Sequence, residues 1–204
     1  MNVTLINSMG SDLSVANAAR VSFAKKNEEF KEPGDRKLIN YLAKHGHWTP
    51  FGHCTLSYHI KAPIFVARQL VKHQVGLVWN EVSRRYVEDE PEFYEPEKWR
   101  GRPTDKKQGS SEEEIVWLDR KRRVGAGVRD ACVYAVDIYN KMLRAGVAPE
   151  QARMVLPQNT YTEWYWTGSL FAFARVCGLR CKGDTQEETR KVAWEIHDLS
   201  LIHI

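Results

Sequence analysis

Two different periodicities follow each other directly in the first half of the chain, and this feature restricts the fold more than any other. From His53 to Lys61 the sequence HCTLSYHIK alternates apolar with polar side chains, as expected of a half-buried antiparallel strand. Pro63 then opens PIFVARQLVKHQ, which we predict to be a helix with proline in its first turn. The chain must therefore combine a sheet with helices.

Helices are also predicted before this strand. Residues 11–25 carry apolar side chains at helical spacing, and Ser11 or Asp12 can serve as the N-cap. A second helix is expected over residues 36–45, because Gly46 suits the left-handed conformation in which many helices end. The polar stretch between the two helices is predicted to be a loop.

The second half of the chain is predicted to be mainly helical. We expect loop and strand over residues 75–87 and an exposed, irregular connection over residues 88–112, which are rich in proline and charge. Further helices are predicted over residues 111–143, 149–156 and 162–178, and from a capping box of Thr185 and Glu188 to about Leu199. The fold class is therefore α+β, mostly helical with a modest antiparallel sheet.

The size and apolar content of the chain fit one core. Because 204 residues at 43% hydrophobic content can fill a single domain, we expect one domain over residues 1–204. No apolar run approaches the roughly 18 to 20 residues that span a bilayer, and MNVTLINSMG lacks the pattern of a secretory signal. Four scattered cysteines favour reduced thiols. We expect a soluble, cytoplasmic protein without a membrane partner.

The charge balance limits the class of ligand. With 30 basic and 26 acidic residues the net charge is +4, a bias too mild to indicate nucleic acid. We therefore expect no nucleic-acid partner, while phosphorylated small molecules remain compatible with the composition.

Three histidines lie close together in the segment HGHWTPFGH. Because histidine is the commonest side-chain metal ligand, His45, His47 and His53 raise the hypothesis of a metal site. However, the segment repeats no Asp, Glu or Cys at ligand spacing. A polar connection between helix and strand is the favoured interpretation, and we predict no metal site.

A second segment, RQLVKHQVGLVWNEVSRRY, mixes cations, amides and a hydroxyl. The cations are Arg68, Lys72, His73, Arg84 and Arg85, and the hydrogen-bonding groups are Gln69, Gln74, Asn80, Glu81 and Ser83. Arginine forks grip phosphate oxygens and amides can read a base edge, so this mixture suits a phosphorylated, hydrogen-bonding ligand. Taken alone it could also be a solvated, charged surface.

This second segment resembles the signature of the flavin-dependent thymidylate synthases, RxxxRHRxxSxNExSxRY. The matching residues are Arg68, His73, Asn80, Glu81, Ser83, Arg85 and Tyr86. Two positions depart from it, since the central triplet is Lys72-His73-Gln74 and eight residues rather than seven separate it from Ser83. HGHWTPFGH and KAPIFVARQ precede the signature and ARMVLPQNTYTEWYW follows it, so the resemblance extends from Ala19 to Trp194.

The resemblance implies two sets of binding residues. Those implied for dUMP are Gln69, Leu70, Val71, Lys72, Glu81, Val82, Ser83, Arg84, Arg85, Arg153 and Arg180. Those implied for FAD are His47, Thr49, Lys72, His73, Gln74, Glu81, Ser169 and Arg175. The family more often has Asn at the positions of Ser169 and Arg175. Arg153 matches a residue contributed by another subunit, and Arg180 matches the catalytic arginine that polarises the uracil near N3.

The resemblance also implies the reaction, which is reductive methylation of dUMP to dTMP. Methylenetetrahydrofolate would supply the carbon, and NADPH would reduce the FAD that delivers hydride. Arg180 stays protonated, so its implied role is electrostatic. Family members are homotetramers in which several chains assemble each active site.

Three alternatives compete with this interpretation. Residues 68–86 could belong to a non-catalytic nucleotide- or RNA-binding protein that grips phosphate and stacks a base. A metal-dependent hydrolase could use the three histidines. Cys181 could attack the uracil as a thiolate beside Arg180, although we favour a structural thiol there and a hydrogen-bonding rather than nucleophilic role for Ser83.

Overall fold

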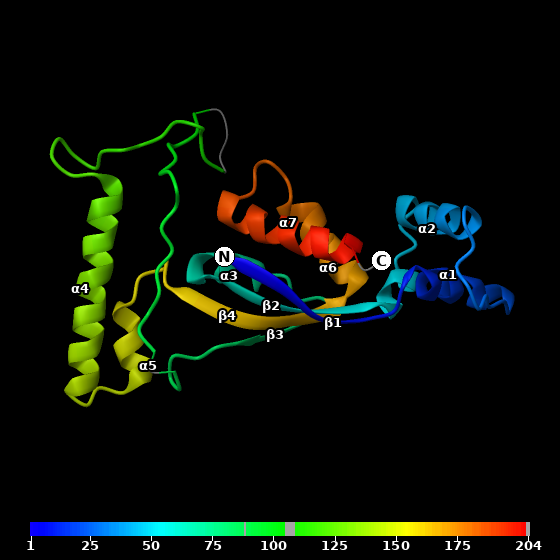
Figure 1. The fold of residues 1–204 in the computed structure, drawn as a ribbon, viewed down its shortest axis with the longest axis horizontal. Coiled ribbons are helices and arrows are strands. Elements are labelled where there is room, and N and C mark those ends of the chain that lie inside the picture. The colour runs from blue at the N-terminus through cyan, green and yellow to red at the C-terminus, as the bar shows by residue number, and fades with distance from the viewer. Residues whose placement is uncertain (88, 105–108, 203–204) are drawn as a thin grey trace.

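Four antiparallel strands form one sheet in the centre of the structure (Figure 1). A computed structural model describes residues 1–87, 89–104 and 109–202 of the chain. The strands are β1 (Asn2–Met9), β2 (Thr55–Pro63), β3 (Leu77–Glu81) and β4 (Tyr161–Ser169), in the order β1-β2-β4-β3. The prediction of an α+β fold with a modest antiparallel sheet is confirmed.

The predicted central strand is confirmed, and its alternation sets which face of the sheet is buried. Leu56, Tyr58 and Ile60 of β2 are at most 2% exposed, while the residues between them are half-buried. Tyr58 pairs with Trp166 of β4, and both rings contact Phe173 edge to face. Large rings therefore fill one side of the sheet.

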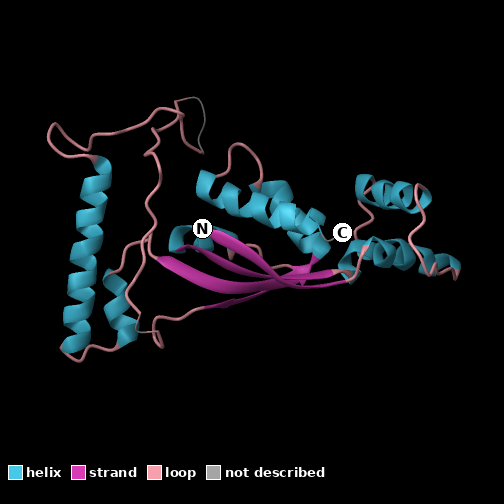
Figure 2. Cartoon of the chain, in the orientation of Figure 1, coloured by secondary structure: helices cyan, strands magenta, loops and turns pink. Residues whose placement is uncertain are grey.

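Three helices cover this buried face: α3 (Ile64–Leu70), α6 (Leu170–Arg180) and α7 (Glu187–Ile202). Figure 2 shows α6 and α7 together on one side of the strands. α3 begins directly after β2 as predicted, but it ends at Leu70 instead of residue 74. Tyr165 on the opposite face of β4 is 56% exposed.

The predicted aromatic helix over residues 162–178 is wrong in its first half. Thr162, Trp164 and Trp166 are buried while Tyr165 is exposed, which is the period of a strand rather than a helix. Trp, Tyr and Thr also favour strands. The many aromatic residues of this segment hid the alternation. The helix α6 begins only after Ser169, whose Oγ accepts a hydrogen bond from the Ala172 amide at 3.2 Å.

The first two helices lie beyond one end of the sheet (Figure 1). They are α1 (Asp12–Arg20) and α2 (Gly34–Lys44), and Val15, Leu42 and Cys54 form a small apolar cluster between them and the start of β2. Ser11 is the N-cap of α1, as predicted, and forms a capping box with Ser14. The strand β1 was not predicted.

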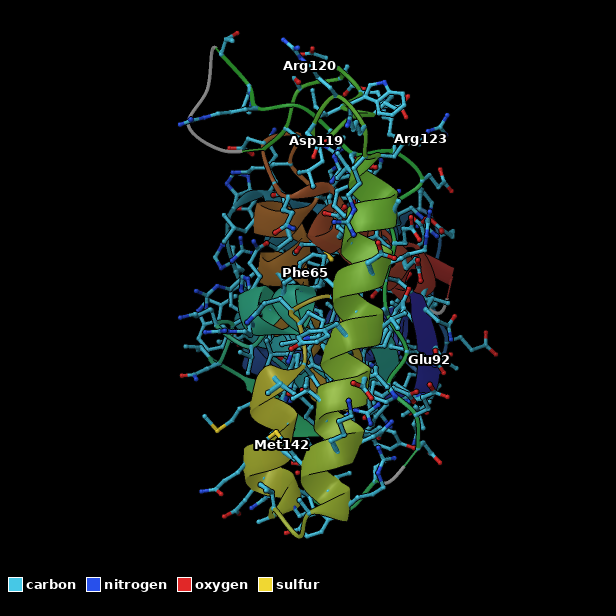
Figure 3. All side chains as sticks on the ribbon, turned by 90° about the vertical axis from the view of Figure 1, so that its left-hand side faces the viewer. Phe65, Glu92, Asp119, Arg120, Arg123 and Met142 are labelled. Atoms are coloured by element: carbon cyan, nitrogen blue, oxygen red, sulfur yellow. The ribbon has the colours of Figure 1, made fainter. Side chains whose placement is uncertain are left out.

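α4 (Val124–Arg144) and α5 (Pro149–Ala152) lie at the other end of the sheet, where Figure 3 shows them side by side. The helix predicted from residue 111 begins only at Val124, because the preceding residues form a turn in which Asp119 accepts two backbone hydrogen bonds. Within α4 only Cys132 and Tyr139 are buried, whereas Val133 and Tyr134 are about 70% exposed. No helix in the described ranges is both long and apolar enough to cross a membrane.

Candidate functional site

The turn between α3 and β3 lies against the junction of β4 and α6. Gly76 in this turn has a φ of +75°, a conformation that side chains rarely adopt. A Cβ added at Gly168 would overlap the carbonyl oxygen of Gly76, so the two backbones approach closely. This packing brings the turn that contains Lys72, His73 and Gln74 next to Ser169.

A hydrogen bond joins this turn to the end of α6. Arg180 Nε donates to His73 Nε2 at 2.9 Å, so that ring nitrogen must be unprotonated. Burial lowers the pKa of His73, and the nearby charges of Arg180 and Arg175 lower it further. The geometry therefore requires a neutral His73 with its proton on Nδ1.

The histidine-rich segment reaches the same end of the sheet. The short 3-10 helix η2 (Thr49–His53) follows Trp48, whose ring lies 5.3 Å from that of Phe171 on α6. His45 and His47 instead pack their rings near Tyr41, with centroids 4.2 and 6.0 Å from it. Within the described ranges no three His, Cys, Asp or Glu side chains could hold a metal ion.

Most residues expected to bind the flavin therefore come from segments that meet at one end of the sheet. They are His47, Thr49, Lys72, His73, Gln74, Ser169 and Arg175. Five of these, all except His73 and Ser169, are solvent-exposed, as a surface that binds a ligand or a second chain requires.

Glu81 is the exception. Leu77, at the start of β3, pairs with Gly168, but Glu81 pairs with Trp164 and lies four residues farther along the strand. At about 3.3 Å per residue this is roughly 13 Å from the junction. Its carboxylate accepts hydrogen bonds from Thr162 Oγ1 at 2.8 Å and Trp79 Nε1 at 3.2 Å.

Ser83 lies beyond Glu81, and none of the described residues forms a hydrogen bond to it as a general base. Its Oγ accepts a hydrogen bond from Arg85 Nε at 3.1 Å, and Arg85 in turn lies over the ring of Tyr86. A protonated guanidinium cannot remove the hydroxyl proton. A nucleophilic Ser83 would also need an activating base, so this geometry suits a hydrogen-bonding role.

Six of the eleven residues expected to bind dUMP line two separate cavities. Gln69 and Arg180 line a cavity of about 650 Å³ between α3, α6 and the start of α7. Glu81, Val82, Arg84 and Arg153 line another of about 370 Å³ beside the far ends of β3 and β4. The two linings share no residue, so one chain does not bring the whole expected set together. Leu70 is fully buried in the core, which leaves only its backbone available.

A chain of hydrogen bonds runs from the larger cavity into the protein. Gln69 Nε2 donates to Gln186 Oε1 at 3.2 Å, and Gln186 Nε2 donates to Glu188 Oε2 at 3.2 Å. Arg100 Nη2 and the Tyr94 hydroxyl donate to the other carboxylate oxygen at 2.6 and 3.3 Å. Burial by itself would raise the pKa of Glu188, but these hydrogen bonds, led by that from Arg100, lower it below its ordinary value.

Sequence reasoning missed Arg100 and Gln186 and gave Glu188 a different role. It predicted a capping box, whereas the Thr185 hydroxyl donates to the Leu179 carbonyl and Glu188 pairs with Arg100. Arg100 is 88 residues away from Glu188 in the sequence. The only signal in the sequence for Gln186 is the number of polar residues that adjoin it.

The cysteines near Arg180 are poor nucleophiles. Burial raises the pKa of Cys177 to about 12 and also raises the pKa of Cys181. Both therefore remain thiols at neutral pH. This favours the structural role over attack by Cys181 on a base.

The chain is similar to known proteins over nearly all of its length. Residues 4–201 match the family described as Thymidylate synthase complementing protein. The flavin-dependent thymidylate synthase of Thermosipho africanus is 37% identical over 196 residues, 96% of this chain and 83% of that protein. That of Thermus thermophilus is 40% identical over 97% of this chain and 70% of its own length. The UMP/dUMP methylase PolB of Streptomyces cacaoi, solved with 5-Br dUMP, superposes with a TM-score of 0.82 at 31% identity, covering 99% of this chain and 90% of that one.

Proposed function

The chain belongs to the Thymidylate synthase complementing protein family, and from that premise we propose that it converts dUMP to dTMP by flavin-dependent reductive methylation. One observation carries the proposal within the structure. The hydrogen bond from Arg180 to His73 joins a residue of the expected nucleotide site to a residue of the expected flavin site. The alternative of a non-catalytic binding protein has no comparable support.

The residues at the junction of β4 and α6 fit a flavin dinucleotide. His47, Thr49, Lys72, His73, Gln74, Ser169 and Arg175 would hold it, and the exposed Lys72 and Arg175 offer cations for its diphosphate. The close approach of Gly76 to Gly168 holds the turn that carries Lys72, His73 and Gln74 against the end of β4. When bound, FAD would supply the hydride that completes the methyl group.

Arg180 would act on the uracil by its charge. A guanidinium stays protonated, so it can stabilise negative charge that develops on the base but cannot remove a proton. The hydrogen bond to His73 holds it in one orientation, and a fixed cation loses less energy to reorganisation than a mobile one. Gln69 lines the same cavity and would bind the base beside Arg180.

We further propose that the second set of nucleotide residues serves a neighbouring chain. Glu81, Val82, Ser83, Arg84, Arg85 and Arg153 lie at the far end of the sheet, so a site that includes Arg180 would need them from another copy. Exposed apolar side chains such as Val133, Tyr134 and Met154 support association into a homotetramer.

The carbon donor and the reductant that the family resemblance implies are compatible with the chemistry of the product. Methylenetetrahydrofolate carries carbon at the oxidation level of formaldehyde, so its conversion to a methyl group on the uracil needs one added hydride. We propose that NADPH supplies this hydride through FAD and that tetrahydrofolate is released.

The direct experiment is an assay of the purified protein with dUMP, methylenetetrahydrofolate and NADPH. We expect a yellow protein with flavin absorbance that forms dTMP, and an Arg180→Ala variant that keeps its flavin but loses at least about a hundredfold in rate, as expected when charge stabilisation is removed. A colourless protein that takes up no added FAD and forms no dTMP would favour the binding-protein alternative.

A further inference from the structure

The hydrogen-bond chain from Glu188 to Gln69 fixes which atom of Gln69 a ligand meets. A side-chain amide has one acceptor end and one donor end, and coordinates alone do not distinguish them. The order of donors and acceptors along this chain does distinguish them. The inference rests on the proposed function, because it takes dUMP as the substrate.

The buried carboxylate of Glu188 decides which group donates in each hydrogen bond from Glu188 to Gln69. Glu188 is 4% exposed, and Arg100 and Tyr94 both donate to it. With its pKa held below the ordinary value, this carboxylate is ionised near neutral pH and can only accept hydrogen bonds. The group of Gln186 that faces Glu188 must therefore be the NH₂.

The orientation of Gln186 in turn determines the orientation of the Gln69 amide. Since the NH₂ of Gln186 faces Glu188, its carbonyl oxygen faces Gln69 at 3.2 Å and needs a donor. Only the NH₂ of Gln69 can serve, so the carbonyl oxygen of Gln69 is left over. This Oε1 is buried and has no hydrogen-bond partner among the described residues.

An acceptor without a hydrogen-bond partner costs free energy, so a ligand that reaches Gln69 from the cavity binds better when it brings a donor to this oxygen. Gln69 and Arg180 line the same cavity, and Arg180 carries only donors. A cavity with one fixed acceptor beside fixed donors suits a base edge that offers an N–H between two carbonyl groups. In a uracil nucleotide N3–H lies between O2 and O4, whereas in cytosine N3 is itself an acceptor.

We propose that Glu188, acting through Gln186, holds Gln69 as an acceptor for the uracil N3–H and thereby makes the site select uracil over cytosine. Arg180 then faces a neighbouring carbonyl oxygen of the base. Glu188 and Gln186 are positioning residues in this arrangement, since they act on the nucleotide only through Gln69.

The test compares dissociation constants for dUMP and dCMP on the FAD-loaded protein. Gln186→Leu removes the group that orients Gln69 and leaves the Arg100–Glu188 pair in place. Glu188→Gln allows residue 188 to donate to Gln186. The side-chain amides of Gln186 and Gln69 can then rotate so that their oxygen and NH₂ groups exchange places, while Arg100 keeps its ion pair with Glu187. In each variant we expect dUMP to bind about tenfold more weakly and dCMP no more weakly, so the preference for dUMP falls at least about tenfold.

Tyr94→Phe is the matched control. It removes another hydrogen bond to the same carboxylate without touching Gln186, so the preference should stay within about twofold of the wild type. If a folded Gln186→Leu or Glu188→Gln variant weakens both nucleotides equally and keeps the wild-type preference, the inference is overturned. A wild-type protein that binds no dUMP at all would instead refute the proposed function.

Discussion

At the scale of single residues, the contact between His73 and Arg180 makes activity depend on pH. The imidazole must be neutral to accept from Arg180, and protonation as the pH falls removes that acceptor. The folded-state pKa lies below the ordinary 6.5, so the contact persists to a pH below 6.5 and is lost under more acidic conditions.

The prediction is that kcat/KM for dUMP falls at acid pH with a midpoint below 6.5. The variant His73→Gln can present an amide oxygen near the position of Nε2 at every pH, so this acid limb should disappear from its profile. A pH–rate profile of both proteins checks this. An unchanged acid limb in the variant would assign the titration to another group.

Cys181 provides the second prediction at this scale. Burial raises the pKa of Cys181, so we expect the thiol to stay protonated and to take no part in the reaction. Cys181→Ala should keep its flavin and turn over dUMP within about twofold of the wild-type rate, a change expected of a small, partly buried side chain. A collapse in rate at normal FAD content would revive the covalent mechanism.

The sequence proposed candidate site residues but not their partners. Gln69 and Arg180 were identified by resemblance, and the structure adds that they line one cavity. Their contacts with Gln186 and His73 join positions more than 100 residues apart, for which no local pattern exists. Arg100 was absent from every motif, although its ion pairs connect an irregular segment to α7.

At the scale of elements, periodicity predicted β2 and most helices, but it placed the start of α4 too early and failed where two elements share one composition. The strand β4 and the helix α6 are both rich in aromatic residues, and Gly168 and Ser169 mark the change between them. Pairing with β2 and β3 on both sides decides in favour of a strand there, and such pairing is not encoded locally. The strand β1 was also not predicted, because its pairing with β2 is not encoded locally either.

The close approach at Gly168 yields a prediction on stability. A Cβ there meets the Gly76 carbonyl and the Leu77 side chain, so β3 must move away from β4. Gly168→Ala should lower the free energy of unfolding by about 1–3 kcal/mol and reduce FAD content. Urea denaturation measures the first effect and flavin absorbance the second.

Gly178→Ala is the control for this prediction. Apart from its neighbours and the backbone of helix α6, in which it lies, no atom of the described residues is within 4 Å of the added Cβ. Its free energy of unfolding should be unchanged or higher by up to about 1 kcal/mol. Equal stability of the two variants would show that the β3–β4 contact is looser than described.

At the scale of the whole molecule, the separation of the two cavities leads to a prediction about assembly. If each site takes Arg180 from one chain and Ser83 from another, an Arg180→Ala chain and a Ser83→Ala chain can complement each other. We expect mixtures refolded together to regain part of the dTMP-forming activity that each variant lacks alone. If mixed oligomers that contain both variants are inactive, each active site lies within a single chain and the prediction is wrong.

The overall architecture followed from the sequence only in outline. The α+β class and the sheet were predicted from the junction at Pro63, where a period of two gives way to a helix. The position of α4 beyond the end of the sheet was not predicted, because its sequence has an apolar face like that of any packed helix (Figure 1). In the structure that face is buried or half-buried, whereas the apolar side chains Val133 and Tyr134 beside it are exposed.

The central claim is that the cavity between α3, α6 and the start of α7 holds a uracil nucleotide against a flavin. A crystal structure with FAD and dUMP bound tests it most directly. We predict the flavin ring beside His73 and Ser169 and the uracil between Gln69 and Arg180. A nucleotide bound elsewhere, with Gln69 and Arg180 facing solvent, would contradict the account.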